Sequence, residues 1–265
     1  MTATTATING ITLAWTDEGQ GLPVVLLHAF PMNRRMWEPQ VRALRARHRV
    51  IAVDLRGHGG SDAPLWRYSM DEFADDVAGL LDHLGIERAV LVGLSMGGYI
   101  LFAFWRRHAA RVRALVFADT RATPDDEPGR AKRIAMAQAA YREGPQAVAD
   151  AMMPILLSPA SRTGRPDLVT LVREIIGSTP VSGILGDLMA LHDRPDSRPT
   201  LPTIARPALV IVGEQDSGTP PSDARVIAEG IPGARLEVIP GAGHLSNLER
   251  PDLFNRALSE FLDGV

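Results

Sequence analysis

Residues 89–108 read AVLVGLSMGGYILFAFWRRH, and this stretch decides the fold. Its first part is a continuous apolar run, which is typical of a strand buried on both faces of a parallel sheet. Its second part has apolar residues at helical spacing and ends in basic residues, which favours a helix. Between them stands Gly93-Leu94-Ser95-Met96-Gly97, a G-x-S-x-G pattern. This pattern predicts a sharp strand-to-helix turn that presents the Ser95 hydroxyl above the sheet.

The alternation of strand and helix continues on both sides of this stretch. The turn dipeptide Asn9-Gly10 lies between two β-favouring segments and predicts an initial hairpin. The remaining elements that we expect before residue 119 are strands at residues 23–28, 49–53 and 112–118 and helices at residues 36–47 and 71–84. Alternating strands and helices indicate an α/β fold with a mostly parallel, doubly wound sheet.

Residues 120–200 have no clear strand pattern. They contain helical stretches at residues 130–142 and 166–176 and are interrupted by many prolines. The sheet pattern then returns, with strands at residues 208–212 and 235–239 and helices at residues 222–229 and 248–262. We therefore expect a core made of residues 1–119 and 201–265, with residues 120–200 inserted as a helical cap.

Composition excludes several classes of function. The 265 residues are 45% apolar and 22% charged, with a net charge of −3, which fits one globular domain and gives no electrostatic footprint for nucleic acid. There are no cysteines, so disulfides and thiolate chemistry are excluded. The N-terminal segment does not have the pattern of a secretory signal, and no apolar run approaches a membrane span of roughly 20 residues. We expect a cytoplasmic protein without a membrane or nucleic-acid partner.

Ser95 is the candidate nucleophile, and a serine hydroxyl needs a base to take its proton. The base is expected late in the chain, because this type of site orders its residues as serine, acid and histidine. His244 lies in Gly241-Ala242-Gly243-His244, between the last expected strand and the last expected helix. We therefore predict His244 as the general base.

Two aspartates compete for the role of the acid that orients the histidine. Asp216 follows the strand at residues 208–212, at the sheet edge where ligands bind, and the loop glycines Gly213 and Gly218 flank it. Asp119 ends the strand at residues 112–118, where it could instead cap a helix or hold Arg121. We predict Asp216 as the acid and keep Asp119 as the rival.

The site also needs backbone N–H groups that stabilise a developing oxyanion. We expect one from Met96, directly after the nucleophile, and one from Phe30, in the loop that follows the first parallel strand. The substrate pocket is expected to use the side chains of Phe30, Met152 and Leu156. No metal or cofactor is expected, because the triad needs none and no cluster of metal ligands is evident.

The sequence resembles the α/β-hydrolase superfamily over essentially its whole length. Residues 54–62, DLRGHGGSD, match that superfamily's D-x-R-G-x-G-x-S loop, which is a structural marker. GLSMGG and residues 193–216 are similar to small bacterial esterases, 3-oxoadipate enol-lactonase-like proteins and cofactor-free perhydrolases. One departure is His28-Ala29, where the superfamily usually has His-Gly. The resemblance implies a serine hydrolase that acts on a small carboxylic ester or lactone through an acyl-enzyme.

Three other readings compete with ester or lactone hydrolysis. A perhydrolase would use the same triad with peroxide in place of water, and Phe30-Pro31 is similar to the oxyanion loop of that group. A triad-bearing signalling or partner-binding protein would show almost no turnover on esters. Haloalkane dehalogenation is disfavoured, because that chemistry uses an aspartate where this chain has Ser95. The sequence indicates neither the physiological substrate nor the oligomeric state.

Overall fold

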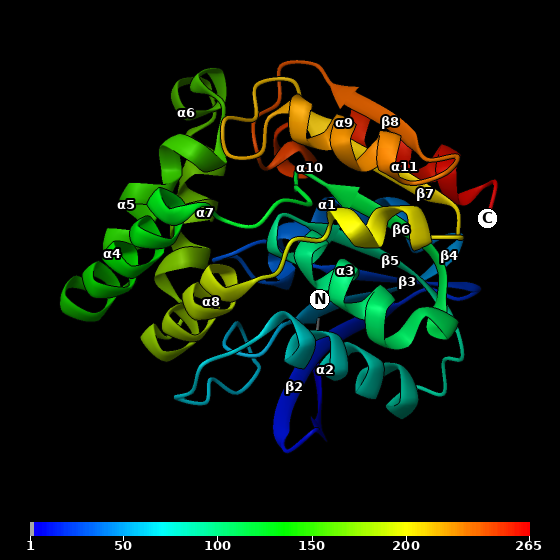
Figure 1. Ribbon diagram of the computed structural model, residues 1–265, viewed down its shortest axis with the longest axis horizontal. Coiled ribbons are helices and arrows are strands. Elements are labelled where there is room, and N and C mark those ends of the chain that lie inside the picture. The colour runs from blue at the N-terminus through cyan, green and yellow to red at the C-terminus, as the bar shows by residue number, and fades with distance from the viewer. Residues whose placement is uncertain (1–2) are drawn as a thin grey trace.

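An eight-stranded sheet forms the centre of the computed structural model, which describes residues 3–265 (Figure 1). The strand order is β1-β2-β4-β3-β5-β6-β7-β8. β2 pairs antiparallel with β1 and β4, and all later neighbours are parallel, as the alternating pattern predicted. The strands are β1 (Thr4–Ile8), β2 (Ile11–Glu18), β3 (Leu22–Leu27), β4 (His48–Asp54), β5 (Ala89–Leu94), β6 (Val112–Ala118), β7 (Ala208–Gly213) and β8 (Arg235–Ile239).

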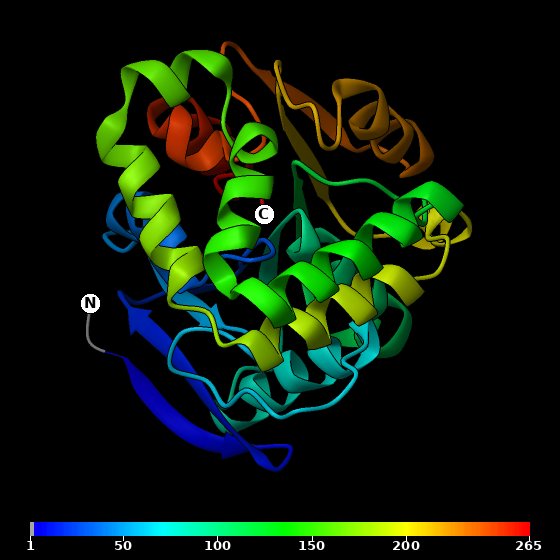
Figure 2. The ribbon, with the colours of Figure 1, turned by 90° about the vertical axis from the view of Figure 1, so that its left-hand side faces the viewer.

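Helices cover both faces of this sheet. Helix α1 packs against α11 on one face, and α2 packs against α3 on the other (Figure 2). The helices of the sheet region are α1 (Glu38–Leu44), α2 (Met70–His83), α3 (Met96–His108), α9 (Pro221–Gly230), α10 (Ser246–Glu249) and α11 (Pro251–Leu262), with short 3-10 turns η1 (Arg34–Trp37), η2 (Ala109–Arg111) and η3 (Arg198–Thr203). All residues of β5 and β7 are buried, because a parallel sheet covered on two faces removes both sides of its strands from water.

Five further helices lie together at one end of the sheet, between β6 and β7 in the chain (Figure 1). Helix α4 packs against α8 and α5, and α5 packs against α7. These helices are α4 (Glu127–Glu143), α5 (Pro145–Leu156), α6 (Pro159–Gly164), α7 (Pro166–Gly177) and α8 (Val181–Asp193). We refer to them as the cap helices, and the division at residues 120–200 into core and cap stays a prediction.

Two sequence predictions of single helices differ from the structure. The segment at residues 248–262 forms two helices that meet at Arg250, whose φ is −133°. Pro251 causes this break, because a proline ring disfavours helical backbone in the residue before it. The segment at residues 36–47 begins instead as η1 and continues as α1 only to Leu44.

Among residues 3–265 no single helix is both long enough and apolar enough to cross a membrane. Helices α7 and α8 meet the length and composition criteria only when they are taken together, and they are bent by 94° relative to each other. Their apolar residues Val172, Ile175, Ile184 and Leu188 are fully buried.

A close backbone contact joins the cap helices to the sheet region. Gly183 in α8 lies against Gly57, which has a φ of +88° and follows β4 in the chain. A Cβ atom at residue 183 would stand 2.1 Å from the Gly57 carbonyl oxygen. Beside this contact, His58 Nε2 and Asp187 Oδ2 lie 2.6 Å apart, and both side chains are fully buried. The position of α8 therefore depends on a glycine pair and a buried polar pair.

The contact predicts different effects for two glycine-to-alanine substitutions. Gly183→Ala should destabilise the protein by about 1–3 kcal/mol, because the new methyl group forces two backbones apart. Gly164→Ala in α6 is the matched control, since nothing lies within 4 Å of its new Cβ. It should be neutral or stabilising by up to about 1 kcal/mol. Urea unfolding of both variants tests this prediction, and equal midpoints would contradict it.

Candidate active site

Ser95 lies at the turn between β5 and α3. Its φ of +54° and ψ of −109° place it in a backbone region that non-glycine residues rarely adopt. Two hydrogen bonds hold this conformation: the Ser95 N–H donates to the Ala118 carbonyl at 2.9 Å, and the Thr120 hydroxyl donates to the Ser95 carbonyl at 2.8 Å. The turn is therefore fixed from the neighbouring strand β6.

The glycines of the G-x-S-x-G pattern are required by close backbone approach. A Cβ atom at Gly93 would stand 2.4 Å from the Gly97 carbonyl oxygen, and one at Gly97 would stand 2.3 Å from the Leu27 carbonyl oxygen. Gly98, directly after the pattern, is limited by a side chain instead, because its Cβ would stand 2.5 Å from the Thr120 side chain. Backbone atoms cannot move aside as the end of a flexible side chain can, so the turn needs residues without side chains.

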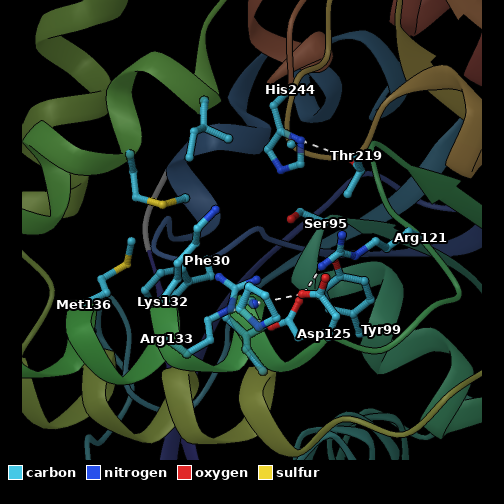
Figure 3. A pocket seen from close by; sticks show the side chains of 17 residues that line it. Phe30, Ser95, Tyr99, Arg121, Asp125, Lys132, Arg133, Met136, Thr219 and His244 are labelled. Atoms are coloured by element: carbon cyan, nitrogen blue, oxygen red, sulfur yellow. Dashed lines mark hydrogen bonds and ion pairs between the residues drawn. The ribbon is translucent and has the colours of Figure 1, made fainter.

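His244 and Asp216 lie on the loops that follow β8 and β7, and the structure brings them together. His244 Nδ1 is 2.8 Å from Asp216 Oδ2, and both residues are buried. Figure 3 shows the His244 ring beside Ser95, and both residues line the same cavity. The three residues predicted as nucleophile, base and acid thus meet at the carboxyl ends of the parallel strands.

His244 and Asp216 each shift the pKa of the other. Burial lowers the pKa of His244, but the charge and hydrogen bond of Asp216, together with the charges of Asp119 and Glu249, outweigh burial and raise it above its ordinary value. Burial raises the pKa of Asp216, but the charge and hydrogen bond of His244, with help from Thr219, lower it overall. Each partner therefore favours the charged form of the other.

Thr219 is a site residue that we did not predict from the sequence. Its hydroxyl donates to Asp216 Oδ2 at 2.8 Å and lies 3.3 Å from His244 Nδ1. The N–H groups of Gly218 and Thr219 donate to Asp216 Oδ1 at 2.8 and 2.9 Å. An aspartate followed by small and polar residues is the signal of such an Asx-type turn, and it was present in the sequence. These donors fix the orientation of the carboxylate.

The rival acid Asp119 is buried close to the same groups but has other partners. Its carboxylate accepts hydrogen bonds from the Gly213 N–H at 2.8 Å and from the Ser246 hydroxyl. Burial, and then the nearby charge of Asp216, raise the pKa of Asp119 well above its usual range. The alternative in which Asp119 holds Arg121 is wrong, because Arg121 pairs with Asp125.

Ser95 and His244 open into a cavity of about 320 Å³. One part of its lining is apolar and includes Phe30, Met136, Met152, Ile155 and Leu191. Another part is charged and includes Arg121, Asp125, Lys132 and Arg133 (Figure 3). The volume falls at the lower end of the range of small-molecule sites.

Two of the three predicted pocket residues, Phe30 and Met152, line this cavity. Leu156 does not, and the sequence prediction for it was wrong: its side chain is fully buried, and its carbonyl accepts a hydrogen bond from the Leu245 N–H at 3.0 Å. Ile155 takes that place and is 38% exposed. Adjacent residues of a helix point about 100° apart, so an error of one position changes a lining residue into a core residue.

The two backbone groups predicted to hold an oxyanion are the N–H groups of Phe30 and Met96. The Met96 N–H is the first of helix α3, and within residues 3–265 neither it nor the Phe30 N–H has an acceptor. An N–H group at a helix N-terminus, such as that of Met96, can bind an anion. The described part of the chain also holds no group of three histidine, aspartate or glutamate residues arranged for a metal ion.

A mostly parallel sheet with a strained serine between a central strand and its helix defines an α/β hydrolase. The chain belongs to the α/β hydrolase fold family, whose model matches residues 23–150 and 162–251. It is a hydrolase, and the fold class and the resemblance inferred from the sequence are confirmed.

A named relative and two solved structures that are similar to this chain support its assignment to the family. The chain is 31% identical to 3-oxoadipate enol-lactonase 2 of Acinetobacter baylyi, over 96% of this chain and 94% of that protein. A thermophilic esterase from Thermogutta terrifontis, solved with malate bound, is 39% identical with a TM-score of 0.96, and the match covers 100% of this chain and 99% of that one. The enol-lactonase from Burkholderia xenovorans LB400 is 34% identical with a TM-score of 0.92, covering 98% and 100%.

The cavity predicts opposite effects for two neighbouring residues of α5. Ile155→Ala should enlarge the cavity and shift the preference toward longer acyl groups with little loss of stability. Leu156→Ala should instead cost about 2–5 kcal/mol of unfolding free energy, because it leaves a hole in packed core. A chain-length series of p-nitrophenyl esters and urea unfolding of both variants test this pair. A chain-length shift in Leu156→Ala without loss of stability would contradict the assignment.

Proposed function

We propose that this protein is a serine hydrolase that cleaves a small carboxylic ester or lactone through an acyl-enzyme intermediate. Ser95 is the nucleophile, His244 the general base and Asp216 the acid that orients the base. The observation that carries this proposal is the buried His244–Asp216 pair, with Nδ1 and Oδ2 2.8 Å apart, in a cavity that Ser95 also lines.

In the first step the Ser95 hydroxyl oxygen attacks the carbonyl carbon of the substrate. His244 accepts the serine proton on Nε2, because its Nδ1–H is held by Asp216 Oδ2. The raised pKa of His244 supports this role, since the imidazolium that forms is stabilised by Asp216. Asp216 remains ionised, and its own pKa is lowered.

The carbonyl oxygen becomes negative in the tetrahedral intermediate. The N–H groups of Phe30 and Met96 receive this charge, and the N-terminal end of α3 adds a favourable dipole. When the intermediate collapses, the bond to the leaving oxygen breaks and His244 returns its proton to that oxygen. An ester then releases an alcohol, whereas an opened lactone keeps its hydroxyl on the acyl chain.

Water completes the reaction. His244 takes a proton from water, the water oxygen attacks the acyl carbon, and the bond to Ser95 Oγ breaks as the proton passes back to the serine. Apart from substrate and water, every group that takes part in these steps belongs to this chain. The names of the similar proteins, an esterase and two enol-lactonases, support an ester or lactone as the substrate. The apolar lining by Phe30, Met152 and Ile155 suits a short carbon chain.

Ser95→Ala should lower kcat by roughly 10⁴- to 10⁶-fold on any ester that the protein hydrolyses, because no other group can form the acyl-enzyme. A serine-directed phosphonate should label Ser95 alone, as read by peptide mass spectrometry. Ser259→Ala on α11, which does not line the cavity, is the matched control and should keep its activity and its labelling. Label on another serine, or activity of Ser95→Ala, would refute the mechanism.

Activity and its pH dependence distinguish Asp216 from Asp119 as the acid that orients His244. Because the pKa of His244 is raised above its ordinary value of 6.5, kcat/KM should rise as the pH increases through a pKa above 6.5, where the base loses its proton. Asp216→Asn should lower kcat by about 10⁴-fold, since it favours the wrong histidine tautomer. It should also move the rise of kcat/KM to lower pH, because the neighbouring negative charge is lost. Asp119→Asn should lower kcat by about tenfold or less. The opposite ranking of the two variants would identify Asp119 as the acid.

A further inference from the structure

One wall of the cavity is rich in cations. Arg121, Lys132 and Arg133 line it, and the acids among the lining residues are Asp125 and Asp126. In Figure 3 Arg133 and Asp125 lie on the side of Ser95 away from His244. We refer to Arg121, Lys132 and Arg133 as the cationic wall. The esterase mechanism uses none of these side chains.

Asp125 cannot neutralise this wall, because it is shared among three guanidinium groups. Its Oδ1 accepts hydrogen bonds from Arg121 and, at 2.7 Å, from Arg194, and its Oδ2 accepts one from Arg133 at 2.9 Å. The side chain is buried, and Arg194 and Arg133 outweigh that burial and hold its pKa well below the usual range. One negative charge therefore faces three positive charges.

The other two acids nearby, Asp126 and Asp223, form no ion pair with the cationic wall in the described residues. Asp126 caps α4, and its Oδ1 accepts a hydrogen bond from the Gly129 N–H at 2.8 Å. Asp223 is close enough for the charge of Arg121 to lower its pKa, although burial dominates and raises that pKa overall. No ion pair joins Asp223 to Arg121 in the described residues.

Two donors of the wall lack acceptors. Lys132 is the only lysine of the chain, and within residues 3–265 it forms no ion pair or hydrogen bond; Figure 3 shows its side chain extending into the cavity. The Nε of Arg121 is buried and has no hydrogen-bond partner in the same range. A buried donor without an acceptor is destabilising, and an anionic ligand oxygen would remove that cost.

We propose that the cationic wall is a subsite for a carboxylate, and that the natural substrate is an ester or lactone that carries a second, free carboxylate group. This inference rests on the proposed function, because it places the scissile carbonyl at Ser95 and the carboxylate at Arg121, Lys132 and Arg133 in one cavity. Guanidinium and ammonium groups form charge-assisted hydrogen bonds with carboxylates, which are stronger than neutral ones. The apolar residues between the two ends contact the connecting carbon chain.

The test compares two substrates that differ in charge but hardly in size: monomethyl adipate and the methyl ester of adipamic acid, in which an amide replaces the free carboxylate. A pH-stat gives kcat/KM for both. Lys132→Met should lower the ratio of kcat/KM for the charged substrate to kcat/KM for the neutral one by about two- to fivefold, as expected for an ion pair formed by an exposed lysine. Arg130→Met, an exposed residue of the same helix that does not line the cavity, should leave the ratio unchanged.

Salt provides a second measurement on the unaltered protein. Exposed charges are screened as ionic strength rises. The ratio of kcat/KM for the charged substrate to kcat/KM for the neutral one should therefore fall between low salt and about 1 M salt. The same change should be much weaker in Lys132→Met. A ratio that does not respond to salt or to Lys132→Met would overturn the subsite.

A binding experiment separates this proposal from the proposed function. Adipate is titrated by calorimetry into Ser95→Ala and into the same variant with Lys132→Met added, so no turnover is needed. The added substitution should weaken adipate binding about two- to fivefold. Lys132-dependent binding without hydrolysis of either ester would refute the hydrolase mechanism and support the subsite. Hydrolysis of both esters with no effect of Lys132 on rate or binding would overturn the subsite alone.

Discussion

The left-handed backbone of Ser95 is the constraint on which the rest of the site depends. Such a conformation costs a non-glycine residue about 1–3 kcal/mol and persists only where the surroundings hold it. Here the holding contacts come from three strands: the Ser95 N–H bonds to Ala118 at the end of β6, and Gly93 of β5 and Gly97 let α3 approach the Leu27 carbonyl of β3. The sheet order, with β5 between β3 and β6, places all three there. The same geometry starts α3 at Met96 and leaves its first N–H free.

The electrostatics of the site follow from burying three ionisable groups in one place. Asp216, His244 and Asp119 are all removed from water, which disfavours the charged form of each. Asp216 remains ionised because Gly218, Thr219 and His244 all donate to it. Asp119 receives less help, and the charge of Asp216 opposes its ionisation, so its pKa moves upward. The pKa values of the two neighbouring carboxyl groups are therefore shifted in opposite directions, and the group whose pKa is lowered is the one hydrogen-bonded to the histidine.

The fold and the three residues proposed for catalysis were predictable because each leaves a local pattern. Buried parallel strands are continuous apolar runs, and Ser95, Asp216 and His244 each follow a strand among glycines. Thr219 was missed because its role depends on the orientation of its hydroxyl toward Asp216. Leu156 was chosen where Ile155 lines the cavity, because the sequence of α5 does not fix which way the helix is turned. The cationic wall was not predicted, since Arg121 follows β6 and Lys132 and Arg133 lie in α4, and these residues come together only when the two elements are placed in space.

The cap helices and the loop of Phe30 are coupled through buried histidines. Asp187 of α8 bonds to His58, and the His58 ring stacks edge-on against His28, with centroids 4.7 Å apart. Burial, and then the charge of His58, lower the pKa of His28, and its Nε2 accepts a hydrogen bond from the Leu55 N–H at 3.0 Å, so the ring is neutral. Its Nδ1–H then donates to the Ala29 carbonyl at 2.9 Å, one residue before Phe30. Removing Asp187 or His58 alone would leave a buried polar group without its partner, which costs more than replacing both. Three successive buried contacts therefore link α8 to the peptide group that carries the Phe30 N–H.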